Sequence, residues 1–180
     1  FTYVSPYNDP QVMAGQGTIG LELLEQLPQI DNIFISMGGG GLISGIGAVL
    51  KAQAPATRII GVAATNSAGL AACMEAGRIV EVEHFDTLAD GVAGGVDEDS
   101  LTLPVSMEIV DRVIHCSEQE IGNALHRLAW VDKMIVEGAA ALAYAAYLSD
   151  ETAFAGQTNV ILLCGANFDQ SKIGPIVAGA

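Results

Sequence analysis

The hydrophobic residues of this chain alternate between two patterns: short continuous apolar runs, and stripes spaced three or four residues apart. Continuous apolar runs of strand length are typical of parallel strands that helices cover on both faces. Such runs predict strands at residues 32–37, 58–64, 112–116 and 159–164, and a shorter one at 2–4. Because helical stripes of ten or more residues separate most of these runs, we predict an α/β fold, a three-layer parallel sheet with helices on both faces.

Local start signals delimit the helices between these runs. Asp9 is placed to cap a helix whose first residue is Pro10. Ser117, with Glu120 three residues later, forms a capping-box sequence, and Asp169 is expected to cap a last helix. The helices predicted before this last one are residues 10–27, 42–54, 67–76, 118–131 and 137–148, with an irregular, glycine-rich stretch at 79–99.

Composition and charge exclude several classes of partner. Twenty-one Asp and Glu against seven Lys and Arg give a formal net charge of −14, which would repel a nucleic acid or an anionic membrane. The most apolar stretch, residues 139–148, is too short to span a bilayer, and the chain does not begin with a signal-peptide pattern. The three cysteines include no CxxC pair, so we expect free thiols in a cytoplasmic protein.

The sharpest local signal is the run of four glycines, Gly38–Gly41, between a predicted strand and a predicted helix. Residues without Cβ allow a tight turn with exposed N–H groups, and the N-terminus of the following helix adds a partial positive charge. We predict a phosphate site in which a side chain at Gly40 would occupy the place of the oxygens. Neither the ATP-binding nor the dinucleotide pattern is complete. The alternative is a turn that serves only close packing.

Two further residues are ambiguous when each is taken alone. Cys164 lies at the carboxyl end of the last predicted strand, where ligands collect in parallel sheets, but a small buried hydrophobe is the ordinary interpretation. Glu137 opens an alanine-rich helix, where a carboxylate complements the helix dipole without further role. The histidines have no partners at metal-ligand or triad spacing, and we assign no role to His84, His115 or His126.

Five motifs stand in the order seen in the threonine/serine dehydratases, pyridoxal-phosphate enzymes of the tryptophan-synthase-β type fold, and the chain resembles that family from Tyr3 to about Asp169. The motifs are Pro-Tyr-Asn-Asp-Pro at 6–10 with Ala-Gly-Gln-Gly-Thr at 14–18, the tetraglycine with Leu42, Thr-Leu-Ala-Asp-Gly at 87–91, Val-Glu-Gly-Ala-Ala at 136–140, and Cys-Gly-Ala-Asn at 164–167. The resemblance implies an ammonia-lyase that converts L-threonine or L-serine to a 2-oxo acid and ammonia. Serine racemase, a dehydratase for another β-hydroxy amino acid, and a non-catalytic anion-binding α/β domain stay open.

The resemblance also implies a cofactor, site residues and partners. The cofactor is pyridoxal phosphate, and the partners are a small amino-acid substrate and further copies of the chain in a homo-oligomer. The implied site residues are Gly38, Gly39, Gly40, Gly41 and Leu42 around the cofactor phosphate, Cys164 at the pyridine nitrogen, and Gly91 and Glu137 on the wall of the cleft.

One departure from the family pattern concerns the catalytic lysine. The family's Schiff-base lysine lies before the matched region, and Lys51, Lys133 and Lys172 are interpreted as solvated charges at helix C-termini. Because Phe1 is not a translation start, we expect a truncated chain. Residues 1–180 are expected to form one domain, the C-terminal part of the cofactor-binding large domain, without the N-terminal segment that carries this lysine. Such a chain should not turn over by itself.

The other departure concerns metal. Some family members bind a divalent cation through two carboxylates and a backbone carbonyl at positions that read Ala63, Ser67 and Gly69 in this sequence. A hard cation requires charged oxygen ligands. We therefore expect no metal at that place.

Overall fold

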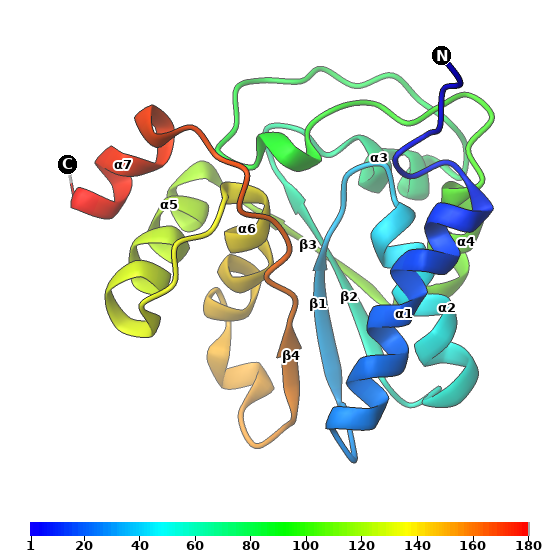
Figure 1. Ribbon diagram of the computed structural model, residues 1–180, viewed down its shortest axis with the longest axis horizontal. Helices are drawn as coiled ribbons and strands as arrows, with labels where there is room; N and C mark the ends of the chain where they lie inside the picture. Colours follow the sequence, from blue (N-terminus) through cyan, green and yellow to red (C-terminus); the bar gives the residue numbers. More distant parts are fainter. Residues whose placement is uncertain (180) are drawn as a thin grey trace.

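The computed structural model describes residues 1–179, in which four parallel strands form one sheet between two layers of helices (Figure 1). The strands are β1 (Asn32–Ser36), β2 (Arg58–Ala64), β3 (Arg112–Cys116) and β4 (Asn159–Ile161), in the spatial order β3-β2-β1-β4. The α-helices are α1 (Pro10–Gln26), α2 (Gly41–Gln53), α3 (Gly69–Ala76), α4 (Thr102–Ile109), α5 (Glu118–Arg127), α6 (Gly138–Leu148) and α7 (Gln170–Ala178). The predicted α/β class is confirmed.

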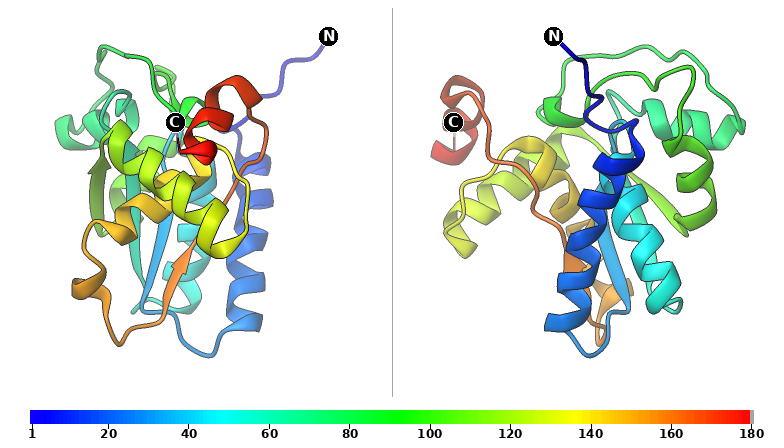
Figure 2. Two further views of the ribbon diagram at one scale, coloured as in Figure 1. Left: turned by 90° about the vertical axis from the view of Figure 1, so that its left-hand side faces the viewer. Right: turned by 45° about the vertical axis from the view of Figure 1, so that its right-hand side comes forward.

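The sheet separates two apolar cores, because successive side chains of a strand point to opposite faces. On one face, Phe34 of β1 packs edge to face against Tyr147 and Phe154, with ring centroids 5.8 and 4.9 Å apart, in the core that α5 and α6 share. On the other face, Ile33 and Ile35 join the core under α1 to α4. Figure 2 shows these two helical layers from the side. None of the helices in residues 1–179 has both the length and the apolar character needed to cross a membrane.

Most predicted element boundaries agree with the structure, and the exceptions have physical causes. The strand expected at residues 2–4 is wrong: the segment is exposed and has no neighbouring strand to pair with. The helix expected to reach residue 131 ends at Arg127 and continues as a π-helical turn, Leu128–Asp132. α4 was not predicted, because its N-cap residue offers no capping side chain and no glycine follows its eight residues, whereas the equally short α3 is followed by Gly77.

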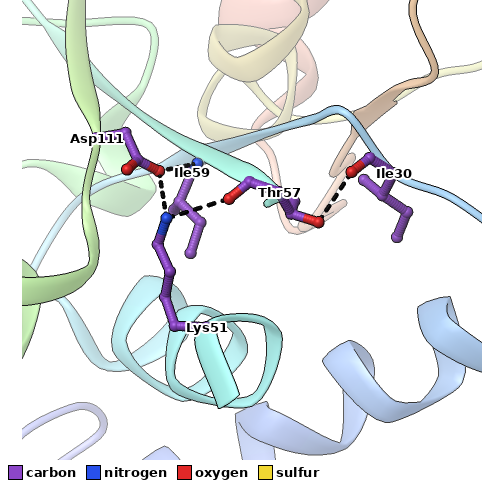
Figure 3. Close-up of polar contacts among 5 residues, drawn as sticks. All are labelled: Ile30, Lys51, Thr57, Ile59 and Asp111. Carbon is purple, nitrogen blue, oxygen red and sulfur yellow. Dashed lines mark hydrogen bonds and ion pairs between the residues drawn. The ribbon is translucent and has the colours of Figure 1, made fainter. Parts of the chain in front are cut away.

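A network of polar contacts joins the sheet to α2 at the amino ends of the strands (Figure 3). Lys51, in the last turn of α2, donates through Nζ to the Thr57 carbonyl at 3.1 Å and to Asp111 Oδ2 at 2.7 Å. The same Asp111 oxygen accepts the Ile59 amide at 2.7 Å, and Thr57 Oγ1 donates to the Ile30 carbonyl at 2.8 Å. These residues lie at or just before the starts of three strands. The network therefore links α2 to the sheet and gives the Lys51 ammonium two acceptors.

Asp111→Ala should lower the free energy of unfolding by about 1–3 kcal/mol, because it leaves the Ile59 amide and the Lys51 ammonium without their shared acceptor. Lys51→Met should cost less, since Asp111 still accepts the amide. Urea unfolding followed by circular dichroism measures both variants. Glu151→Ala, which removes an exposed ion pair with Arg127, is the control and should change stability by less than about 1 kcal/mol. Equal losses for the Asp111 and Lys51 variants would contradict this ranking.

Candidate functional site

One cleft of about 400 Å³ contains all of the residues that the sequence analysis assigned to a cofactor site. It lies at the carboxyl ends of β1 and β4, which are neighbours in the sheet. Its walls come from the turn after β1, the glycine-rich loop before α4, the start of α6 and the segment after β4; the assigned residues on them are Gly38, Gly39, Gly40, Gly41, Leu42, Gly91, Glu137 and Cys164. The placement groups these residues without testing what they bind, so their roles remain predictions.

The turn after β1 presents a row of backbone N–H groups. Gly40 adopts a left-handed conformation, with φ of 91°, and is the N-cap of α2. The first helical hydrogen bond runs from the Ser44 amide to the Gly40 carbonyl at 2.9 Å. Within residues 1–179, the amides from Gly38 to Ile43 donate to no other group of the chain. Unpaired N–H groups together with the positive end of a helix dipole make this turn an anion-binding site in geometry.

The glycine turn is also packed closely from behind. A Cβ at Gly40 would lie 2.8 Å from Thr102 Cβ, and a Cβ at Gly41 would lie 2.7 Å from Tyr7 Cα. The expectation that a side chain at Gly40 would occupy the place of phosphate oxygens is therefore wrong, because such a side chain meets Thr102. Close packing, the alternative considered from the sequence, is present together with the free amides.

Three residues that the sequence analysis did not assign hold the back of this turn. The Tyr7 ring lies against Gly39, and Tyr7 Oη donates to Asp97 Oδ1 at 2.7 Å. Burial and, to a lesser extent, the hydrogen bond to Asp97 together raise the pKa of Tyr7 to about 12, so the phenol stays protonated at neutral pH. Thr102 Oγ1 donates to the Gly39 carbonyl at 2.6 Å. The Pro-Tyr-Asn-Asp-Pro motif could have pointed to Tyr7. Asp97 and Thr102 make contacts with residues far away in the sequence, which no local motif indicates.

Cys164 lies on the wall formed by the segment after β4, and its place differs from its prediction in two respects. The strand expected to reach residue 164 ends at Ile161, so the cysteine lies beyond the sheet in a segment without regular structure. Cys164 is exposed, whereas Cys73 and Cys116 are buried, and all three thiols are free. The interpretation of Cys164 as a small buried hydrophobe is wrong. Free thiols were predicted, and the structure confirms them.

Glu137 immediately precedes α6 but does not cap it with its side chain. Its carboxylate Oε2 accepts the Asn167 amide at 2.8 Å, and its own amide donates to the Gly165 carbonyl at 3.2 Å. Glu137 therefore contacts the segment after β4 in addition to complementing the helix dipole. Glu137 is the one charged residue on the cleft wall in the part of the chain that the structure describes.

The three lysines lie away from the cleft wall. Lys51 belongs to the network at the opposite end of the sheet, and Lys133 follows the π-helical turn, as its predicted place at a helix end requires. Lys172 lies in the first turn of α7 and pairs with Asp90 at 2.7 Å, so its expected position at a helix C-terminus is wrong. None of them is placed to hold a ligand in the cleft.

Ser67, one of the positions that the resemblance relates to a cation site, belongs to a hydrogen-bond network that contains no carboxylate. Ser67 is buried, and its Oγ is 2.7 Å from His84 Nδ1 and accepts the Gly94 amide at 3.1 Å. This network gives His84, which had no assigned role, a contact that supports the loop on the cleft wall. Among residues 1–179, no group of three or more His, Cys, Asp or Glu is arranged to hold a metal ion.

Comparisons with known proteins agree with this geometry. The family model described as "Pyridoxal-phosphate dependent enzyme" matches residues 1–165. The catabolic L-threonine dehydratase TdcB of Escherichia coli (strain K12) is 40% identical over 176 residues, which are 97% of this chain and 53% of that protein. L-threonine ammonia-lyase of Thermotoga maritima is 39% identical and is covered over 43% of its length.

Solved structures give the same result. The processed form of threonine deaminase isoform 2 from Solanum lycopersicum superposes with a TM-score of 0.90 at 33% identity, over 100% of this chain and 53% of that one. Maize serine racemase superposes with a TM-score of 0.86 at 34% identity, over 98% of this chain and 54% of that one. The chain thus spans about half the length of the relatives it matches. Since the family model covers more than nine-tenths of the chain, with the glycine turn inside the match, this chain belongs to the pyridoxal-phosphate-dependent enzymes.

Proposed function

We propose that this chain forms part of an ammonia-lyase that acts on L-threonine or L-serine and gives a 2-oxo acid and ammonia. It would supply two walls of the cofactor site: one that binds the phosphate of pyridoxal phosphate and one that faces its pyridine ring. The observation that carries the proposal is the row of unpaired amides from Gly38 to Leu42. The cleft above them has no cationic side chain in the described part of the chain, so an anion must be recognised by neutral N–H groups. Relatives named as threonine dehydratases and ammonia-lyases support the choice of reaction.

The residues on the cleft fit pyridoxal phosphate at two places. The Gly38–Leu42 amides suit its phosphate, and the Cys164 thiol on the opposite wall suits the ring nitrogen as a neutral partner. When bound, the cofactor supplies an electron sink for the carbon from which the α-proton leaves. A neutral thiol would keep that sink weak, which favours loss of the β-hydroxyl over transamination. Gly91 and Glu137 would line the space between the phosphate site and Cys164.

The chain's own residues do not provide the catalytic base. Such an enzyme needs a lysine at the cofactor, and Lys51, Lys133 and Lys172 lie elsewhere. We propose that the lysine and the group that holds the substrate carboxylate come from another part of the protein. Residues 1–180 would then be one part of the cofactor-binding domain.

We further propose that the protein is a cytoplasmic homo-oligomer. Three free thiols are typical of a reducing compartment. Exposed apolar side chains after α5, at Trp130, Val131, Met134 and Ile135, provide surface that association could cover. The net charge of −14 argues against nucleic acid as a partner.

Phosphate should bind at the glycine turn. In the NMR spectrum of the nitrogen-labelled chain, inorganic phosphate should shift the Gly38–Leu42 amides more than those of distant glycines such as Gly156. Gly39→Ala should weaken this binding about tenfold, since its Cβ would meet the Tyr7 ring. Gly15→Ala, where a Cβ meets nothing within 4 Å, is the matched control. Shifts spread evenly over the surface would contradict the site.

Cys164 should be the single fast-reacting thiol, and deoxypyridoxine phosphate, which lacks the aldehyde, should protect it. Cys73 and Cys116 are 0% exposed, and burial raises the pKa of Cys116 to about 12, so both should react only on unfolding. Ellman's reagent measures the rates, and Cys164→Ser should remove the fast phase. Protection equal to that given by inorganic phosphate alone would argue against a ring at Cys164.

The chain by itself should release no ammonia from L-threonine or L-serine, because no lysine lies at the cleft. A coupled assay for the 2-oxo acid tests this outcome. Turnover that disappears on replacing Lys51, Lys133 or Lys172 by Ala would show that the catalytic base was misplaced. Product analysis of the full-length protein with L-serine then separates an ammonia-lyase from a racemase.

A further inference from the structure

The segment that carries Cys164 is not held by the sheet. β4 ends at Ile161, and α7 begins only at Gln170. Figure 1 shows the chain between them as an extended path without regular structure. Within residues 1–179, the hydrogen bonds of residues 163–168 are two, and both run to Glu137.

Glu137 contacts this segment through its backbone and its side chain. Its amide donates to the Gly165 carbonyl at 3.2 Å, and its carboxylate Oε2 accepts the Asn167 amide at 2.8 Å. The other carboxylate oxygen, Oε1, would clash with a Cβ at Gly165 and lies 2.8 Å from where a Cβ of Gly91 would be. The carboxylate thus fills the space between two glycines on different walls of the cleft.

Glu137 is itself firmly placed. It precedes α6, whose first nine residues except Tyr144 are buried against the sheet. Ser36, the last residue of β1, donates through Oγ to the Ala139 carbonyl at 2.7 Å. A continuous set of contacts therefore leads from the end of β1, beside the glycine turn, to the Cys164 segment.

We propose that Glu137 is a positioning residue: it holds residues 164–167 at the cleft and thereby sets the place of the Cys164 thiol. A carboxylate suits this task, because a charged acceptor forms a stronger hydrogen bond with an amide than a neutral one and a helix N-terminus stabilises the negative charge. A role limited to the helix dipole would require no contact with Asn167. That the thiol then meets the cofactor ring rests on the function proposed above, but the positioning itself does not.

Amide hydrogen exchange and thiol labelling test the proposal in the absence of any cofactor. Glu137→Ala should speed exchange of the Asn167 amide about tenfold or more, and should change the rate at which Ellman's reagent labels Cys164. Glu137→Gln keeps an acceptor oxygen and should restore both values in part. Asp150→Ala is the matched control, since Asp150 likewise accepts a backbone amide, that of Ala153, but far from the cleft. It should change neither value.

A second variant keeps the test decisive if Glu137→Ala does not fold. Gly165 has a φ of 120°, so Gly165→Ala is strained in any background, but the clash with the carboxylate exists only when Glu137 is present. Gly165→Ala should therefore change Cys164 labelling in the wild type and less so with Glu137→Ser, which removes the carboxylate and keeps a good N-cap residue for α6. Asn167 exchange and Cys164 labelling that stay at wild-type values in every folded variant would overturn the proposal. Failure of phosphate or deoxypyridoxine phosphate to bind would instead refute the proposed function and leave the positioning role standing.

Discussion

Unpaired backbone N–H groups at the start of α2 are the constraint on which the rest of the site depends. A helix begins with amides that have no internal acceptor, and most proteins satisfy some of them with a capping side chain. This chain has Gly40 at the N-cap, which offers none. The amides remain available to an anion only if the turn keeps its shape, and Tyr7 and Thr102 hold it from behind. Glycine is thus required at Gly40 both by its positive φ and by the nearness of Thr102.

Because the chain is acidic, the anion site proposed above relies on short-range recognition. With a net charge of −14, the protein cannot attract a phosphate from a distance. Hydrogen bonds from neutral amides act only at contact and keep their strength in a cleft partly shielded from water. Glu137, the one charged residue on the cleft wall within residues 1–179, accepts the Asn167 amide of the segment after β4 with one of its carboxylate oxygens. The two walls can therefore carry opposite electrostatic character within about 400 Å³.

The sequence predicted what depends on local pattern and missed what depends on distant contacts. The strand at residues 58–64 was predicted to the residue, because a short apolar run is typical of a strand covered on both faces. The run at 159–164 has the same character, yet pairing with β1 is confined to its first three residues. Tyr7 and Asp97 are 90 residues apart, so no spacing rule could join them. Local reasoning also gave Glu137 a helix-dipole role, whereas its contact with Asn167 appears only in the folded chain.

The strand order explains why these separate features meet. The strands β2 and β3 follow one another on one side of β1, whereas β4 lies on its other side. The order in which strands are added to the sheet therefore reverses between β1 and β4, although all four strands are parallel. In parallel α/β sheets a crevice opens at such a switch point, because the helices that follow or precede the two strands lie on opposite faces. Here α2 follows β1 on one face, and α6 precedes β4 on the other. The glycine turn and Glu137 thus belong to different helical layers. Bringing Cys164 opposite the glycine turn therefore needs a contact that crosses from α6 to the segment after β4, and Glu137 supplies it.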